Sequence, residues 1–153
     1  MMNDDWIAML NALLDVGARF LVVGAHALAV HGVPRGTQDL DILIDPTPDN
    51  ADRVWRAMIL FGAPVASLGI SKSDLVNPEM VIQFGLPPNR IDFLTSISGV
   101  AAFDVAWAGR VEHAVRGRTI PFIGRAELIA NKRAAGRRRD LADVEALGED
   151  PDA

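Results

Sequence analysis

Residues 20–44 read FLVVGAHALAVHGVPRGTQDLDILI, and this stretch is the strongest indication of the fold. The apolar run at 20–23 predicts a short buried strand, and Gly24 then begins a helix of small residues that extends to His31. Residues 39–44 predict a second strand. Strands and helices that alternate in this way are typical of an α/β or α+β domain.

The rest of the chain continues this alternation and contains no linker, repeat or low-complexity stretch. We therefore expect a single domain of the α/β (α+β) class over residues 1–153. The further elements that we expect are a first helix between Asn3 and Gly17, a helix at 48–61, a mixture of loop and short helix at 62–78, strands at 80–84 and 90–95, a helix at 100–107, a hairpin at 111–115 and 119–122, and helices at 125–135 and 137–147, which Gly136 separates.

The composition fits a folded, soluble domain. The 153 residues are 50% hydrophobic and have a formal net charge of −5, and a chain of this length buries about two-thirds of its unfolded surface. The longest apolar run, at 20–30, is too short to cross a bilayer, and the acidic start lacks the basic segment of a secretory signal. The absence of cysteine excludes thiol catalysis, thiolate metal sites and disulfides. We therefore expect a cytoplasmic protein without a membrane partner.

The charges are unevenly distributed along the chain. Residues 105–139 contain nine bases and two acids, whereas residues 140–153 contain six acids and no base. This pattern predicts local sites of opposite sign.

Paired carboxylates in the strand at 39–44 are the first candidate for chemistry. Because side chains alternate along a strand, Asp39 and Asp41 share one face, with Cβ atoms about 6–7 Å apart, while the apolar residues between them point into the core. Asp92 repeats the pattern in the strand at 90–95. If the two strands are neighbours, the three carboxylates form one cluster that suits two Mg²⁺ or Mn²⁺ ions. The alternative is that these acids lie on exposed strand faces or cap turns.

Gly24 is the second candidate, because it lies where a strand meets a helix. A glycine at this junction allows the backbone to approach a ligand, and free N–H groups at a helix start bind phosphate. The alternative interpretation is a tight turn without a ligand.

Together these residues resemble the nucleotidyltransferase superfamily with the DNA polymerase β-like fold. The resemblance is strongest to a small bacterial branch related to abortive-infection nucleotidyltransferase toxins, and it covers residues 20 to 147. The residues that carry it are Gly24-Ala25, the segment HGVPRGTQDLD at 31–41, Asp92, the segment ELIANK at 127–132, and the residues Gly136-Arg137 and DLAD at 140–143.

The resemblance implies a mixed sheet flanked by helices, with a core at about 20–123 and a helical segment at about 125–147. It implies that Asp39 and Asp41 ligate the metals that carry a triphosphate and that Asp92 completes the second metal site and helps to activate the attacking hydroxyl. Gly24 and Ala25 would contact the phosphates through their backbone. Ala25 departs from the glycine or serine usual in the family, so a phosphate contact from a serine hydroxyl is lost.

Several further residues have two interpretations. Arg35 and Thr37 either contact phosphate or organise the loop before Asp39. Lys132 and the arginines at 137–139 form either a basic wall that faces a triphosphate or RNA substrate, with Lys132 as the best single candidate, or a solvated helix face on which Arg139 pairs with Asp143. Asp140 and Asp143 are expected to be caps or pair partners, and His26 and His31 are too far apart around a helix to share a metal ion.

The sequence therefore predicts a Mg²⁺- or Mn²⁺-dependent nucleotidyltransferase that transfers NMP from an NTP to a hydroxyl of a protein, a tRNA or a small molecule. A second hypothesis is a catalytically weak or inactive module of the same fold that binds a partner, such as a toxin–antitoxin component with a cognate toxin or antitoxin. A glycosyltransferase also uses Asp-x-Asp with a divalent ion, but its nucleotide-sugar domain needs a longer chain.

Overall fold

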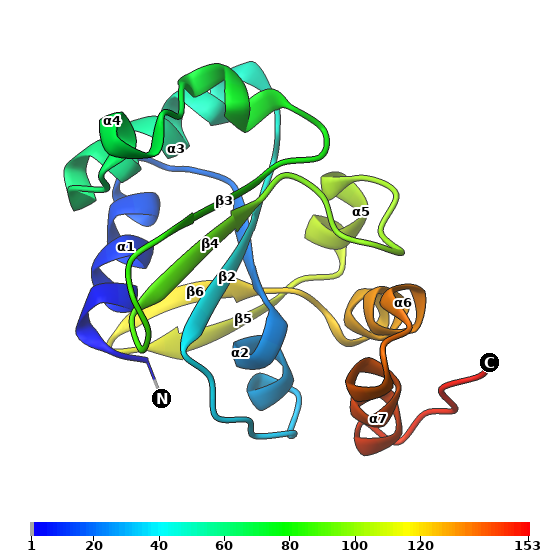
Figure 1. The fold of residues 1–153 in the computed structure, drawn as a ribbon. Helices are drawn as coiled ribbons and strands as arrows, with labels where there is room; N and C mark the ends of the chain where they lie inside the picture. The colour runs from blue at the N-terminus through cyan, green and yellow to red at the C-terminus, as the bar shows by residue number, and fades with distance from the viewer. Residues whose placement is uncertain (1) are drawn as a thin grey trace.

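A mixed six-stranded sheet forms the centre of the computed structural model, which describes residues 2–153 (Figure 1). The strands lie in the order β3-β4-β2-β1-β6-β5, and both parallel and antiparallel pairs occur. The predicted α/β class with a mixed sheet is confirmed. The strands are β1 (Phe20–Val23), β2 (Asp39–Ile44), β3 (Val81–Phe84), β4 (Arg90–Leu94), β5 (Val111–Val115) and β6 (Arg118–Phe122).

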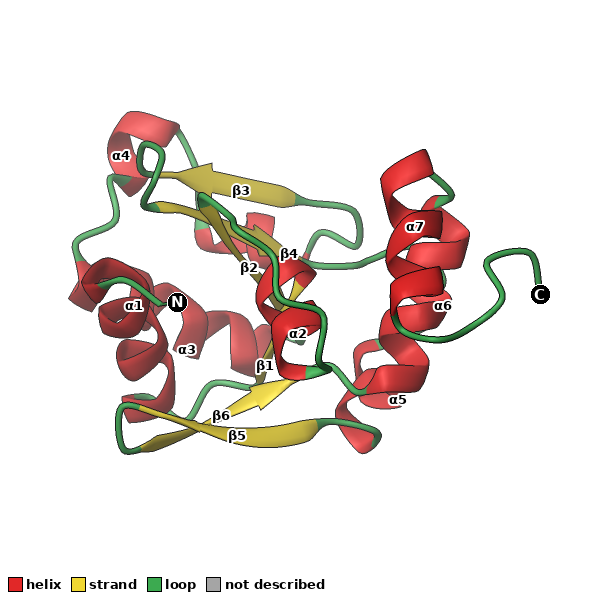
Figure 2. Cartoon of the chain, turned by 90° about the horizontal axis from the view of Figure 1, so that it is seen from below, coloured by secondary structure: helices red, strands yellow, loops and turns green. Residues whose placement is uncertain are grey.

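Helices cover both faces of this sheet. Helices α1 and α3 lie on one side, and α2, α6 and α7 lie on the other (Figure 2). Within residues 2–153 no helix is both long enough and apolar enough to span a membrane. The helices are α1 (Asp4–Asp15), α2 (Gly24–Val30), α3 (Pro48–Phe61), α4 (Val65–Leu68), the 3₁₀ helix η1 (Lys72–Val76), α5 (Phe103–Ala108), α6 (Arg125–Ala135) and α7 (Arg138–Ala146).

The two faces of β2 differ in their burial and polarity. Leu40, Ile42 and Ile44 are fully buried, and the alternation of side chains along the strand places them on the face opposite Asp39 and Asp41. Helix α1, which precedes the segment that resembles a nucleotidyltransferase, also contributes fully buried side chains to the core, Met9 and Leu10 among them. The opposite face of β2 carries Asp39 and Asp41, which are partly exposed at the start of the strand, whereas Leu43 further along the same face is buried.

The helix expected at 100–107 begins later than predicted, at Phe103. Gly99 has a φ of 77°, and a side chain at this position would collide with the backbone of Ala130 in α6. Asn131 also donates a hydrogen bond to the carbonyl oxygen of Ser98. The chain before α5 is therefore held as a loop against α6, and this loop becomes one wall of the pocket described below.

Candidate active site

The centre of the site is a pair of aspartates on two neighbouring parallel strands. Strands β2 and β4 pair so that Asp41 lies opposite Asp92 and Asp39 lies opposite Arg90. Residues in register on adjacent strands have their side chains on the same face. The structure therefore places the three carboxylates that the sequence analysis singled out on one face of the sheet, with Asp41 and Asp92 opposite each other, and it adds an arginine to the same face.

Asp41 and Asp92 form an electrostatically strained pair. Burial, followed by the charge of Asp92 and a hydrogen bond with it, raises the pKa of Asp41 to about 7. The charge of Lys132 acts in the opposite direction and is the smallest of these influences. Within residues 2–153 the Oδ1 atom of Asp92 is buried and has no hydrogen-bond partner. Two close carboxylates with an unsatisfied oxygen require a proton or a cation between them at neutral pH.

This environment fits a divalent metal ion. Hard carboxylate oxygens on rigid strands are ligands that Mg²⁺ and Mn²⁺ accept, and the unpartnered Oδ1 atom of Asp92 offers such a ligand next to Asp41. A bound ion would offset both the burial of the Asp41 carboxylate and its repulsion by Asp92, the two largest causes of its raised pKa.

Asp39 has a different partner, which the sequence analysis missed. Both of its carboxylate oxygens accept hydrogen bonds from Arg90, from Nε at 2.7 Å and from a terminal nitrogen at 3.0 Å. In the described part of the chain, no three acidic or histidine side chains form a ready ligand cluster. The bidentate pair explains this arrangement, because it directs the oxygens of Asp39 towards Arg90. Alternation along a strand puts Arg90 and Asp92 on the same face, but only the strand register shows that Arg90 meets Asp39.

Gly24 packs directly against Asp41. A Cβ atom at this position would collide with the carboxylate of Asp41, and the φ of 69° is unfavourable for other residues. Glycine is therefore required here for close approach to the carboxylate. The structure gives Gly24 this steric role, and the backbone contact with phosphate stays a prediction.

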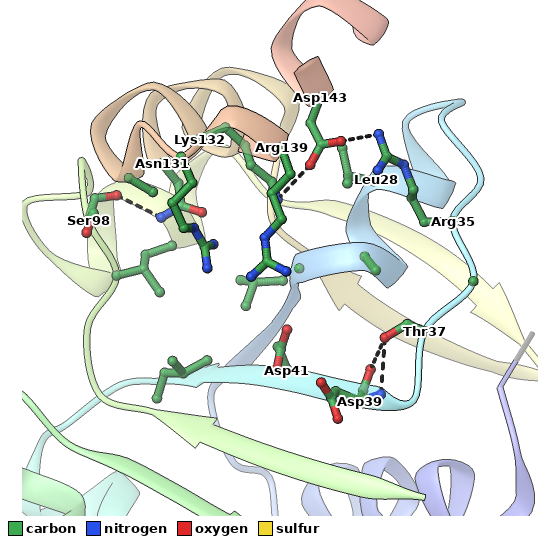
Figure 3. A pocket seen from close by; sticks show the side chains of 18 of the residues that line it. Leu28, Arg35, Thr37, Asp39, Asp41, Ser98, Asn131, Lys132, Arg139 and Asp143 are labelled. Atoms are coloured by element: carbon green, nitrogen blue, oxygen red, sulfur yellow. Dashed lines mark hydrogen bonds and ion pairs between the residues drawn. The ribbon is translucent and has the colours of Figure 1, made fainter. Parts of the chain in front are cut away.

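A cavity of about 630 Å³ opens above the aspartates. Asp41 points into it from β2, and the side chains of α6 and α7 form the opposite wall (Figure 3). All the residues that the sequence analysis proposed for nucleotide binding line this cavity, whereas Asp92 lies beside it, next to Asp41. Those lining residues are Gly24, Ala25, Arg35, Thr37 and Lys132.

A network of ion pairs builds the wall formed by α6 and α7. Lys132 lies 3.1 Å from a carboxylate oxygen of Asp143 and 3.4 Å from one of Asp140. Asp143 also pairs with Arg35, and Arg137 donates two side-chain hydrogen bonds to Asp140. Both aspartates are buried. They are pair partners, as predicted, and Asp140 also caps α7 by accepting a hydrogen bond from the backbone N–H of Arg137.

These pairs explain how two buried carboxylates are tolerated. Burial acts to raise the pKa of Asp140, but the hydrogen bond from Arg137 and the charge of Lys132 lower it overall. Arg35 reaches from the loop before β2 to Asp143 in α7. It therefore fastens this loop to the wall, which is the organising role that the sequence analysis left open beside phosphate binding.

Arg139 corrects one expectation. It does not pair with Asp143, because Arg35 and Lys132 already occupy that carboxylate. Instead the Arg139 side chain extends from α7 into the cavity towards Asp41 (Figure 3). Within residues 2–153 we find no hydrogen bond or ion pair for its guanidinium group. A basic wall was one of the two interpretations of the arginines at 137–139, but the direction of the Arg139 side chain depends on how α7 packs against α6.

The remaining candidates have structural contacts. Thr37 accepts a hydrogen bond from the backbone N–H of Asp39 and donates one to its carbonyl oxygen, both at 3.1 Å, which fixes the start of β2. The ring of His31 is 2.8 Å from the carbonyl oxygen of Ile123. His26 packs edge-on against Trp6, and burial lowers its pKa to about 4.

No family model matches this chain, and the search of curated proteins gave no match. The function is therefore inferred from the geometry and charge of the site.

Proposed function

We propose that this protein is a Mg²⁺- or Mn²⁺-dependent nucleotidyltransferase that transfers NMP from an NTP to a hydroxyl group. The observation that carries the proposal is the opposition of charges across one cavity. Asp41 lies at its floor, with Asp92 beside it on the neighbouring strand. Basic side chains from α6, α7 and the loop before β2, which we call the cationic wall, face Asp41 across the cavity (Figure 3). A metal-bound triphosphate needs both a carboxylate site for its cation and positive groups for its phosphates.

The cationic wall is suited to an anion, because its positive charges outnumber its negative ones. Four basic side chains line the cavity from α6, from α7 and from the loop before β2. Three of them pair with two aspartates, Asp140 and Asp143, so the basic groups exceed the acidic groups by two. Arg139 retains an unused guanidinium group, and this group binds phosphate oxygens well. The basic residues are Arg35, Lys132, Arg137 and Arg139.

In the proposed reaction the protein forms no covalent bond with the substrates, and it acts by positioning them and by stabilising charge. The acceptor oxygen bonds to the α-phosphorus of the NTP, the bond to the bridging oxygen breaks, and pyrophosphate leaves. The hydroxyl proton passes to a carboxylate, for which Asp92 is our candidate. A divalent ion, when bound, supplies charge neutralisation between the carboxylates and the phosphates. The chain itself positions the acidic pair, fixes the loop before β2 and presents the cationic wall.

The experiment is incubation of the protein with labelled NTPs, Mg²⁺ and cell extract, followed by separation of RNA, protein and small molecules. We expect label on one of these fractions, and we expect the double variant Asp41→Asn/Asp92→Asn to abolish it. Asp15→Asn is the matched control, because Asp15 is an exposed residue that pairs with Arg118. Transfer by the double variant at the wild-type rate would show that the site is misassigned.

A partner-binding module without turnover is the second candidate, and one observation favours it. Asp39 is hydrogen-bonded to Arg90, and Lys132 forms ion pairs with Asp140 and Asp143. A residue expected to bind metal and a residue expected to bind phosphate therefore already have partners within the protein. This candidate predicts that the same extract yields no labelled product and that the chain is recovered in a stable complex with another macromolecule.

A further inference from the structure

The contact between Arg90 and Asp39 bears on how many metal ions the site accepts. The two side chains lie opposite each other on β4 and β2, and each is about two-thirds buried, with 33% and 29% of the side chain exposed. The guanidinium group donates to both carboxylate oxygens in a fork. This bidentate geometry is the strongest arrangement available to an arginine and a carboxylate.

The backbone of Arg90 is also fixed from two sides. Its carbonyl oxygen accepts a hydrogen bond from the indole N–H of Trp6, at 3.0 Å. Its N–H donates to the carbonyl oxygen of Gln38, at 3.1 Å. The base of the side chain is therefore anchored to α1 and to the residue before β2, and the guanidinium group is placed on Asp39 by the fold itself.

Arg90 does not line the cavity, although Asp39 and Asp41 do. The guanidinium group approaches Asp39 from β4, so Arg90 does not belong to the cationic wall. The guanidinium group lies on the same face of the sheet as Asp39, Asp41 and Asp92, and it provides a positive charge next to these carboxylates. The positive charge of Arg90 also interacts with Asp92 and Asp41, although the hydrogen bond with Asp39 is the largest influence that raises the pKa of Arg90.

We propose that Arg90 is a built-in cation that neutralises Asp39, so that the acidic face takes one divalent ion, held by Asp41 and Asp92, and not two. This inference rests on the proposed metal-dependent function and narrows it. A second divalent ion at Asp39 has to displace two charge-assisted hydrogen bonds and then lies close to the displaced guanidinium group, which repels it. The pair Asp41–Asp92 carries no such obstacle, because Oδ1 of Asp92 is unpartnered in the described residues.

The experiment counts Mn²⁺ ions bound to each chain by electron paramagnetic resonance at pH 8 and low salt, with Mn²⁺ alone as the probe. We expect one ion for the wild type and two for Arg90→Gln, in which Asp39 is released. Arg90→Lys keeps the positive charge and is expected to bind one ion. The double variant Asp39→Asn/Arg90→Gln removes both partners and is also expected to bind one, and it provides a test if Arg90→Gln alone does not fold. Arg118→Gln, which breaks a surface pair with Asp15, is the matched control and should equal the wild type.

The outcomes separate this inference from the proposed function. Two ions on the wild type, both lost in Asp41→Asn/Asp92→Asn, overturn the inference and leave the proposed metal-dependent function intact. One ion on both the wild type and Arg90→Gln also overturns it, because Asp39 then contributes no site even when it is released. No ion on any variant contradicts the proposed metal site and this inference together.

Discussion

Removal of the Asp41 charge should stabilise the metal-free protein at alkaline pH. The pKa of Asp41 rises from 3.8 to about 7 on folding, chiefly because the carboxyl is buried beside Asp92. Between these two values the folded chain binds more protons than the unfolded chain, so stability falls as pH rises and the full penalty is present above about pH 7. The Asp41→Asn variant lacks this penalty.

The size of the effect follows from the shift. One pKa unit corresponds to about 1.4 kcal/mol, so the change from 3.8 to about 7 sets an upper limit of about 4 kcal/mol. Water in the open cavity screens part of this energy, and we expect about 2–3 kcal/mol at pH 8.5. For a chain of this length that corresponds to about 5–10 °C in Tm.

The assay is thermal or urea unfolding of wild type and Asp41→Asn at pH 5 and pH 8.5 in the presence of EDTA. We expect the variant to gain stability relative to wild type as pH increases, and we expect Mg²⁺ to narrow the difference at pH 8.5 by binding the wild type. Other titrating groups cancel in the comparison of the two proteins. A difference between them that is the same at both pH values would refute the argument that burial beside Asp92 raises the pKa of Asp41.

Three further predictions test the walls of the cavity. Gly24→Ala should destabilise the protein by more than about 2 kcal/mol in urea unfolding, because a Cβ meets the carboxylate of Asp41 at a positive φ, and an unchanged midpoint would contradict this packing. Lys132→Met should cost about 3 kcal/mol by the same assay, since it leaves the buried Asp140 and Asp143 with fewer partners, whereas a loss below about 0.5 kcal/mol would show that the arginines suffice. Arg139→Gln should change stability by less than about 0.5 kcal/mol but weaken binding of Mn²⁺ and a non-hydrolysable NTP analogue at least about tenfold in calorimetry, and equal affinity would remove Arg139 from the proposed phosphate site.

Strand periodicity explains how much of this arrangement could be predicted. Alternation placed Asp39 and Asp41 on one face, and the same rule placed Asp92 on a face of the second strand. These are local properties of an extended chain, and they hold whatever the strands pack against. The glycine at 136 likewise ended α6 where predicted, because its φ of 68° suits a helix terminus.

Contacts between distant segments could not be predicted in this way. The pair of Arg90 with Asp39 depends on the register of two strands that are separated by about 50 residues. The pair of Arg35 with Asp143 depends on where α7 packs, and it leaves Arg139 free to enter the cavity. The rule for residues i and i+4 on a helix suggested a local partner for Arg139, but a buried carboxylate selects the cations that reach it from all sides.

The most direct test of the central claim is the anomalous diffraction of Mn²⁺ in crystals grown with Mn²⁺ and a non-hydrolysable NTP analogue. We expect a Mn²⁺ peak bound by carboxylate oxygens of both Asp41 and Asp92, with the phosphates of the analogue between this ion and Arg139. A peak elsewhere, or an analogue bound without any ion at these two aspartates, would contradict the account.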